Sequence, residues 1–150
     1  MMKVAIGSDH AGFKLKEELK TYIASLNIEV KDFGCHSEES VDYPDIAKEV
    51  ALSVVKGEVD RGILICGTGI GMSISANKVK GIRAAVGNEL LSVKLSREHN
   101  DANILTLGAR IIGVEVAKEA VRIFLETPFL GGRHQRRVEK IGEMEGLKCI

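Results

Sequence analysis

The chain has 150 residues, 45% of them hydrophobic and 28% charged, which is the composition of an ordinary globular protein. Basic and acidic residues are equal at 21 each, so no net charge attracts the protein to nucleic acid or to a membrane surface. No apolar run approaches the roughly 18 residues that a membrane-spanning helix needs. Cys35, Cys66 and Cys149 are an odd number without CxxC spacing, which favours free thiols in a reducing compartment. We therefore expect a cytoplasmic protein with a single domain over residues 1–150.

The first half of the chain is predicted to be strand, helix, strand, loop and helix. Runs rich in β-branched residues at 3–8 and 28–33 predict two strands. An apolar stripe with helical spacing lies between them, made of Leu15, Leu19, Tyr22, Ile23 and Leu26. The polar loop 34–43 follows, and Pro44 suits the first turn of the next helix. The buried stripe of that helix is predicted to be Ile46, Ala47, Val50, Ala51, Val54 and Val55.

The second half repeats the alternation. In chain order it contains strand 62–66, a short helix after Gly71, strand 82–86, a helix over about 88–98, strand 103–107, and a helix whose stripe runs from Val114 to Leu125. Single helices between strands imply right-handed crossovers and a parallel sheet. The predicted fold is a Rossmann-like α/β fold, with a doubly wound five-stranded parallel sheet and helices on both faces.

One further helix is predicted from Arg133 to about Glu143. No strand follows it, so it must pack somewhere other than on a new strand. Docking onto a partner subunit is one interpretation, and a frayed helix on the surface is the other.

The turn after the third strand reads Cys66-Gly67-Thr68-Gly69-Ile70-Gly71. Glycine adopts the positive φ values that let successive backbone N–H groups converge on an anion, and the following helix start adds partial positive charge. A thiol beside such a turn ionises more readily than a free cysteine. The pattern indicates a nucleophile or base next to an anion site, although tight packing alone also explains a glycine-rich turn. A dinucleotide fingerprint would need glycine where Met72 stands, and no Walker lysine follows.

Asp9 and His10 follow the first strand, so in a flavodoxin-like strand order they share the carboxyl edge of the sheet with Cys66. The simpler interpretations are a helix N-cap for Asp9 and a solvated first-turn residue for His10. In the last helix Arg133 and Arg137 are one turn apart and are able to grip one phosphate. A solvated basic stripe explains the same pattern, and it is too short and too poor in aromatics for nucleic acid.

Five segments in order resemble the B-type ribose-5-phosphate isomerases, part of a wider sugar-phosphate isomerase group that includes the galactose-6-phosphate isomerase subunits. The segments are residues 7–12, 42–45, 66–71, 97–103 and 132–137. The resemblance runs from Lys3 to about Ile141. It implies reversible interconversion of ribose 5-phosphate and ribulose 5-phosphate through a cis-enediolate, without metal or organic cofactor.

The resemblance also implies roles for individual residues. Cys66 matches the catalytic base, His99 matches the residue that assists opening of the furanose ring, and Thr68 is expected to give its hydroxyl to the enediolate oxygen. One branch of the family has serine at the thiol position and a glutamate elsewhere, but here Ser75 stands near the place of that glutamate. Substrate contacts are expected from Asp9, His10, Gly67, Thr68, Gly69, Ile70, Gly71, Asn100, Arg110, Arg133 and Arg137.

His99 precedes the fifth strand, whereas Cys66 ends the third. The two residues should therefore lie at opposite edges of one sheet, roughly 17 Å apart. We predict that His99 and Asn100 enter the site from a second subunit, in agreement with the homodimer, sometimes paired into a tetramer, that the resemblance implies. No pair of histidines has metal-ligand spacing, so we expect no metal.

Three rival functions fit parts of this sequence. A six-carbon aldose phosphate of the allose or galactose type could be isomerised in the same pocket. A non-catalytic sugar-phosphate sensor would not need Cys66, His99 and Asp9 together. A thiol redox protein would need a resolving cysteine near Cys66, and there is none in the sequence.

Overall fold

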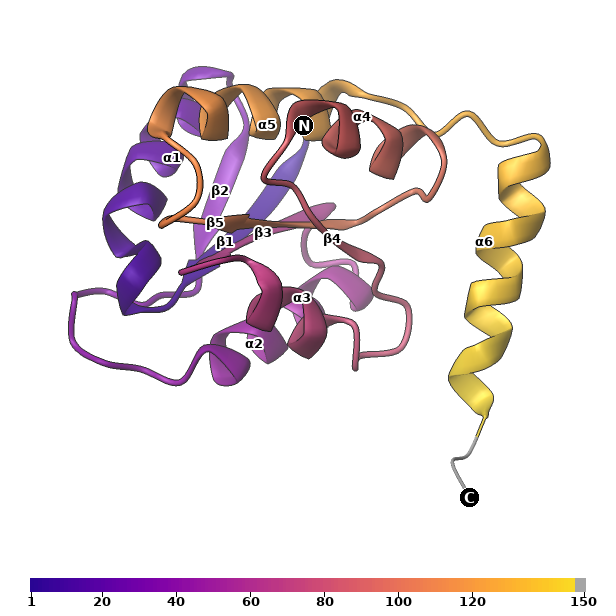
Figure 1. Cartoon of the computed structure of the whole chain (residues 1–150), viewed down its shortest axis with the longest axis horizontal. Helices are drawn as coiled ribbons and strands as arrows, with labels where there is room; N and C mark the ends of the chain where they lie inside the picture. Colours follow the sequence, from indigo (N-terminus) through magenta and orange to yellow (C-terminus); the bar gives the residue numbers. More distant parts are fainter. Residues whose placement is uncertain (148–150) are drawn as a thin grey trace.

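Five parallel strands form one sheet in the order β2-β1-β3-β5-β4 (Figure 1). This computed structural model describes residues 1–147, so Cys149 lies outside the described residues. The strands are β1 (Lys3–Ser8), β2 (Glu29–Asp32), β3 (Arg61–Cys66), β4 (Ala84–Val86) and β5 (Ile104–Gly108). Each predicted strand is present, with ends shifted by at most two residues. The prediction of a doubly wound parallel sheet is confirmed.

Helices cover both faces of the sheet (Figure 1). They are α1 (Phe13–Ser25), α2 (Tyr43–Val55), α3 (Ile70–Ala76), α4 (Leu90–Glu98), α5 (Val114–Glu126) and α6 (Arg133–Glu143), with short 3-10 turns at η1 (His10–Gly12) and η2 (Met144–Gly146). Helices α1, α4 and α5 contribute to one apolar core, and α2 and α3 to the other. Among residues 1–147, no helix combines the length and apolar character needed to cross a membrane.

The alternation of side chains along β3 divides the apolar residues between the two cores. Ile63 and Ile65 pack with α1 and α5, while Leu64 and Cys66 pack on the side of α2 and α3. All four side chains are buried, and full burial of a large aliphatic side chain stabilises the fold by about 1.5–3 kcal/mol. The Cys66 side chain therefore faces the layer that contains the start of α3.

The strand order differs from the flavodoxin-like order at one edge of the sheet. β5 lies between β3 and β4, and the short β4 forms the edge. β5 is buried along its whole length, whereas β4 has only three residues, all of them partly or largely exposed. A strand that is buried along its whole length has neighbours on both sides, which explains why β5 takes the interior place. The neighbours that matter for the predicted site, β1 and β3, pair as expected.

Helix α6 lies beside the rest of the chain rather than on either face of the sheet (Figure 1). The segment before it is attached through the Leu130 N–H, which donates to Glu98 O at 3.1 Å. Beyond it, Glu145 accepts a hydrogen bond from the Gly81 N–H at 2.8 Å. Large apolar side chains along this part of the chain remain exposed, namely Leu130, Ile141, Met144 and Leu147. The predicted bounds of the helix are confirmed, and in the single chain much of its apolar surface is uncovered.

Lys16 departs from the simple amphipathic pattern of α1, because its side chain is fully buried. Its ammonium group lies 2.7 Å from Asp32 Oδ2 and 3.0 Å from Glu17 Oε1. Burial alone would raise the pKa of Asp32, but hydrogen bonds from Lys16, Lys20 and the Gly34 N–H together hold it below its usual value. The ion pair connects the inner face of α1 to the end of β2.

We predict that Asp32→Asn lowers the free energy of unfolding at pH 7 by about 3 kcal/mol, because it leaves the Lys16 ammonium buried without its main partner. The lowered pKa of folded Asp32 means that its contribution is present above the unfolded pKa of about 3.9 and is lost as the pH falls through the lower folded value. Urea unfolding at pH 7 and at pH 3 measures both effects. Glu115→Gln, which disrupts the exposed pair with Lys118, is the control and should change little. Equal stability of wild type and Asp32→Asn at pH 7 would contradict the prediction.

Candidate active site

The carboxyl ends of β1 and β3 meet at one edge of the sheet. Ser8 pairs with Ile65, and the Asp9 N–H donates to Ile65 O at 3.1 Å. The backbone of Asp9 is therefore bonded to the residue directly before Cys66 on the neighbouring strand. The expected convergence of the residues that follow β1 with the end of β3 is present in the backbone.

The thiol of Cys66 accepts a hydrogen bond from the turn that follows it. The Gly69 N–H donates to Sγ at 3.2 Å, and such a donor stabilises negative charge on sulfur. Within residues 1–147, the N–H groups of Gly67, Thr68 and Gly71 donate to no acceptor. Three backbone donors thus remain available next to a sulfur that already receives a fourth. Cys66 itself is 5% exposed, so only a small part of the side chain is open to a ligand.

Glycine is required in this turn for two separate reasons. Gly69 has φ 83°, in the left-handed region that favours glycine. Gly71 has an ordinary conformation, but a Cβ there would lie 2.5 Å from the ring of Tyr43. Gly108 at the end of β5 is needed in the same way, since its Cβ would lie 2.6 Å from Thr68 O. The alternative interpretation of the glycines as packing residues is therefore correct at some positions without excluding an anion site at others.

Two side chains that the sequence analysis did not identify hold the turn against β5. Asn88 donates from Nδ2 to Thr68 O and accepts the Gly108 N–H at Oδ1, both at 2.8 Å. Thr106 donates from its hydroxyl to Gly69 O at 2.7 Å. Asn88 follows β4 at the same edge of the sheet, and that position was the signal available in the sequence. Tyr43 was likewise passed over, although it lies within one of the motifs that resemble the isomerases.

Asp9 acts as an N-cap, as the simpler interpretation had it. Its Oδ1 accepts the N–H groups of Ala11 at 3.0 Å and Gly12 at 3.2 Å, and the residue is largely buried. Oδ2 makes no hydrogen bond within residues 1–147. The cap fixes the carboxylate directly after the carboxyl end of β1, and its second oxygen is left to accept a hydrogen bond from a hydroxyl group.

His10 is held by the loop that follows β2. The Val41 N–H donates to His10 Nδ1 at 3.3 Å. The imidazole is therefore more constrained than the solvated first-turn residue that the sequence also allowed. Arg110 lies on the other side of the turn, where its guanidinium Nη1 is 3.3 Å from the position that a Cβ on Gly67 would take. A positive charge at this distance favours an anion over the turn.

His99, Asn100, Arg133 and Arg137 are not at this edge. The register pairs Ile104 with Gly62, so the start of β5 lies four residues, about 13 Å, from Cys66 along β3. His99 precedes β5 by a further five residues and stacks on His134, with ring centroids 4.3 Å apart. Burial lowers the pKa of His134, and the basic side chains of its neighbours His99, Arg133 and Arg137 lower it further. One chain therefore holds the predicted site residues in two separate groups at opposite ends of its sheet.

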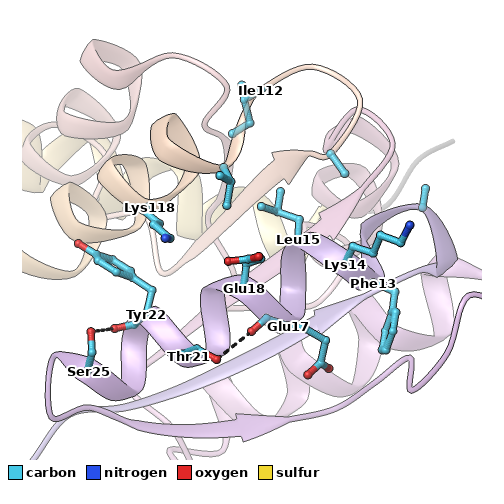
Figure 2. A pocket seen from close by; sticks show the side chains of 13 residues that line it. Phe13, Lys14, Leu15, Glu17, Glu18, Thr21, Tyr22, Ser25, Ile112 and Lys118 are labelled. Carbon is cyan, nitrogen blue, oxygen red and sulfur yellow. Dashed lines mark hydrogen bonds between the residues drawn. The ribbon is translucent and has the colours of Figure 1, made fainter.

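Two cavities lie outside the turn. The larger, about 1000 Å³, is a groove between α1 and the β5–α5 segment (Figure 2). It begins at Ala11 and Ala109, one position after His10 and one before Arg110. The smaller, about 520 Å³, includes Asn100, Arg83 and Ile141. Cys66 lines neither of these two cavities. Among the described residues, no three His, Cys, Asp or Glu side chains form a group that could hold a metal ion.

The chain matches the Ribose/Galactose Isomerase family model over residues 4–141. It is 59% identical to a putative sugar phosphate isomerase of Bacillus subtilis, covering 96% of this chain and 97% of that protein. It is 52% identical to ribose-5-phosphate isomerase B of Escherichia coli, covering 97% of both. The structure of Clostridium thermocellum ribose-5-phosphate isomerase B superposes with a TM-score of 0.95 at 56% identity, covering 96% of this chain and 97% of that one.

These matches extend over nearly the whole chain and agree with the fold and with the five motifs. The chain belongs to the Ribose/Galactose Isomerase family. It is an isomerase whose relatives act on sugar phosphates.

We predict that Asn88→Ala lowers kcat/KM about tenfold or more, because the turn loses both side-chain bonds to Thr68 and Gly108. Asn77→Ala is a matched control. Asn77 makes the same two kinds of bond, to the N–H and carbonyl of Ala84, at the edge strand rather than at the turn. We expect both variants to lose similar stability, but only Asn88→Ala to lose activity in steady-state assays. Equal kinetic effects of the two variants would contradict a specific role for Asn88.

Proposed function

We propose that this isomerase interconverts ribose 5-phosphate and ribulose 5-phosphate, with residues 1–150 acting as a single domain. The observation that carries the proposal is the hydrogen bond from the Gly69 N–H to Cys66 Sγ, next to three backbone donors that have no acceptor in the described part of the chain. Aldose–ketose isomerisation needs a base for one carbon-bound proton and donors for the oxygen that gains charge. Both are available within one turn of the chain. The names of the two ribose-5-phosphate isomerase B relatives support the choice of substrate.

Cys66 acts as the base in this mechanism. As thiolate it removes the proton from C2 and returns it to C1 on the same face, with a cis-enediolate between the two steps. The free N–H groups of Gly67, Thr68 and Gly71 stabilise the enediolate oxygen, each well-placed donor by about 3 kcal/mol. The Thr68 hydroxyl supports the same oxygen. Low exposure of Cys66 suits this role, because the sulfur has to contact only the substrate while water is excluded.

The remaining groups bind the sugar phosphate and open its ring. Asp9 and His10 contact hydroxyl groups of the sugar at the carboxyl end of β1. Arg110, Ile70 and the turn glycines line the same region. His99 assists proton transfer as the furanose ring opens, and Asn100 contacts the sugar beside it. Arg133 and Arg137, one helical turn apart, bind the phosphate.

We further propose that each active site combines two chains of a homodimer, which can pair into a tetramer. Cys66 and His99 belong to opposite ends of the same sheet, so one chain cannot bring its own pair together. A twofold axis brings the Cys66 region of each chain next to the His99 region of the other chain, which gives two equivalent sites in the dimer. The exposed apolar side chains along α6 and η2 support docking on a partner, because burying them removes apolar surface from water.

A six-carbon aldose phosphate is the second candidate substrate, and the description of the family as ribose and galactose isomerases favours keeping it. Comparing kcat/KM for ribose 5-phosphate, allose 6-phosphate and galactose 6-phosphate decides between them. Uptake of deuterium at C2 in deuterated water separates any isomerase from a sugar-phosphate sensor, which incorporates none.

Cys66→Ala is expected to lower kcat by about a thousandfold or more, because no other group accepts the C2 proton. The dissociation constant for ribose 5-phosphate should change by no more than about threefold, since the backbone donors remain. Cys35→Ala removes the other buried thiol described and should leave both constants close to wild type. Calorimetric binding and steady-state kinetics measure the two quantities. Substantial activity in Cys66→Ala would remove Cys66 from the mechanism.

Shared sites predict complementation between two inactive proteins. A hybrid dimer of a Cys66→Ala chain and a His99→Asn chain contains one site with both changes and one site with neither. Random reassociation of equal amounts should therefore restore about a quarter of wild-type activity. Each variant dissociated and reassociated alone is the control and should stay inactive. If mixing restores nothing although hybrids form by mass spectrometry, the sites are not shared.

A further inference from the structure

Asp32, the last residue of β2, receives hydrogen bonds from two directions. Lys16 Nζ and Lys20 Nζ of α1 lie 2.7 Å and 2.8 Å from Oδ2. The other oxygen, Oδ1, accepts the Gly34 N–H at 2.8 Å. Because the Lys16 side chain is fully buried, its ammonium group requires an acidic partner held next to it. The carboxylate therefore joins α1 to the backbone that follows β2.

The backbone of Gly34 is in turn bonded to the last residue of β1. The Ser8 N–H donates to Gly34 O at 2.6 Å, and the Cys35 N–H donates to Ser8 O at 2.7 Å. Ser8 directly precedes Asp9 and His10. A continuous series of hydrogen bonds thus leads from the buried ammonium of Lys16 to the peptide that precedes two proposed sugar contacts.

The far end of the same loop reaches His10 itself. The Val41 N–H donates to His10 Nδ1 at 3.3 Å. A neutral imidazole that accepts at Nδ1 carries its proton on Nε2. The loop that begins beside Asp32 therefore favours the tautomer in which His10 Nε2 is a donor, which suits a ligand hydroxyl or phosphate oxygen.

We propose that Asp32, held by Lys16, is a positioning residue for the substrate-binding end of β1, and that the loop it anchors selects the Nε2–H tautomer of His10. The proposal rests on the proposed function, because that function assigns Asp9 and His10 to the sugar phosphate. Asp32 acts through the Gly34 backbone, and Lys16 acts through Asp32.

Two double variants separate the hydrogen-bond acceptor from the ion pair. Lys16→Met with Asp32→Asn removes both charges but keeps an oxygen for the Gly34 N–H. Lys16→Met with Asp32→Leu has nearly the same shape and no acceptor. We expect the first to keep the KM for ribose 5-phosphate within about threefold of wild type, and the second to raise it about tenfold with a smaller change in kcat.

Two-bond ¹⁵N–¹H correlation spectra of the imidazoles give a readout that does not depend on turnover. Comparison with His10→Asn assigns the His10 signals. Wild type and the asparagine double variant should show the Nε2–H tautomer, whereas the leucine double variant should show a mixture of tautomers.

A wild-type KM and a wild-type His10 spectrum in the folded leucine double variant overturn the proposal. Equal losses in both double variants overturn it too, because the acceptor would then make no difference. If circular dichroism shows that the leucine double variant does not fold, Asp32→Ala replaces it in the same background and the same outcomes apply. Absence of turnover in wild type removes the proposed function, while the spectra still decide the positioning role.

Discussion

The contact between the glycine turn and the end of β5 determines the geometry of the candidate site. Thr68 O approaches the backbone of Gly108 so closely that no side chain fits there, and Asn88 bridges the same two residues. Thr106, two residues before Gly108 on the same strand, donates a hydrogen bond from its hydroxyl group to Gly69 O. These bonds turn the Gly69 N–H toward Cys66 Sγ, while the N–H groups of Gly67, Thr68 and Gly71 have no acceptor among residues 1–147. Moving the turn relative to β5 would separate the sulfur from its donors, so the surroundings of the Cys66 thiol depend on this contact at the strand end.

The two ends of the sheet carry different groups of the proposed site residues. The carboxyl edge has the thiol, the backbone donors and the capped carboxylate of Asp9. The amino edge has the stacked imidazoles of His99 and His134, with Arg133 beside them on α6. The intervening strands are rigid and buried, so no side-chain rotation in one chain closes the gap. The homodimer that we propose unites these two groups of residues across its twofold axis and also covers the exposed apolar surface near α6.

The interior of the protein contains the charged side chain of Lys16. Lys16 is surrounded by Asp32, Glu17 and the ring of Phe13, so its ammonium group is compensated although the chain as a whole has no net charge. Isolated buried ion pairs add little to stability, and replacing both partners by neutral groups is often harmless. The Asp32 carboxylate also accepts the Gly34 N–H, so the same group connects the buried ammonium to the backbone that follows β2.

Much of this protein was determined by the sequence alone. The alternation of short β-branched runs with apolar helical stripes predicted the five strands and the bounds of α6, because side-chain periodicity is a local property. The motif around Cys66 and the order of the five segments identified the family. Only the tertiary structure decided the interior place of β5, the burial of Lys16 and the bridge made by Asn88. Each of these depends on which segments meet across the sheet, and an isolated asparagine or lysine carries no local sign of a partner 16 or 20 residues away.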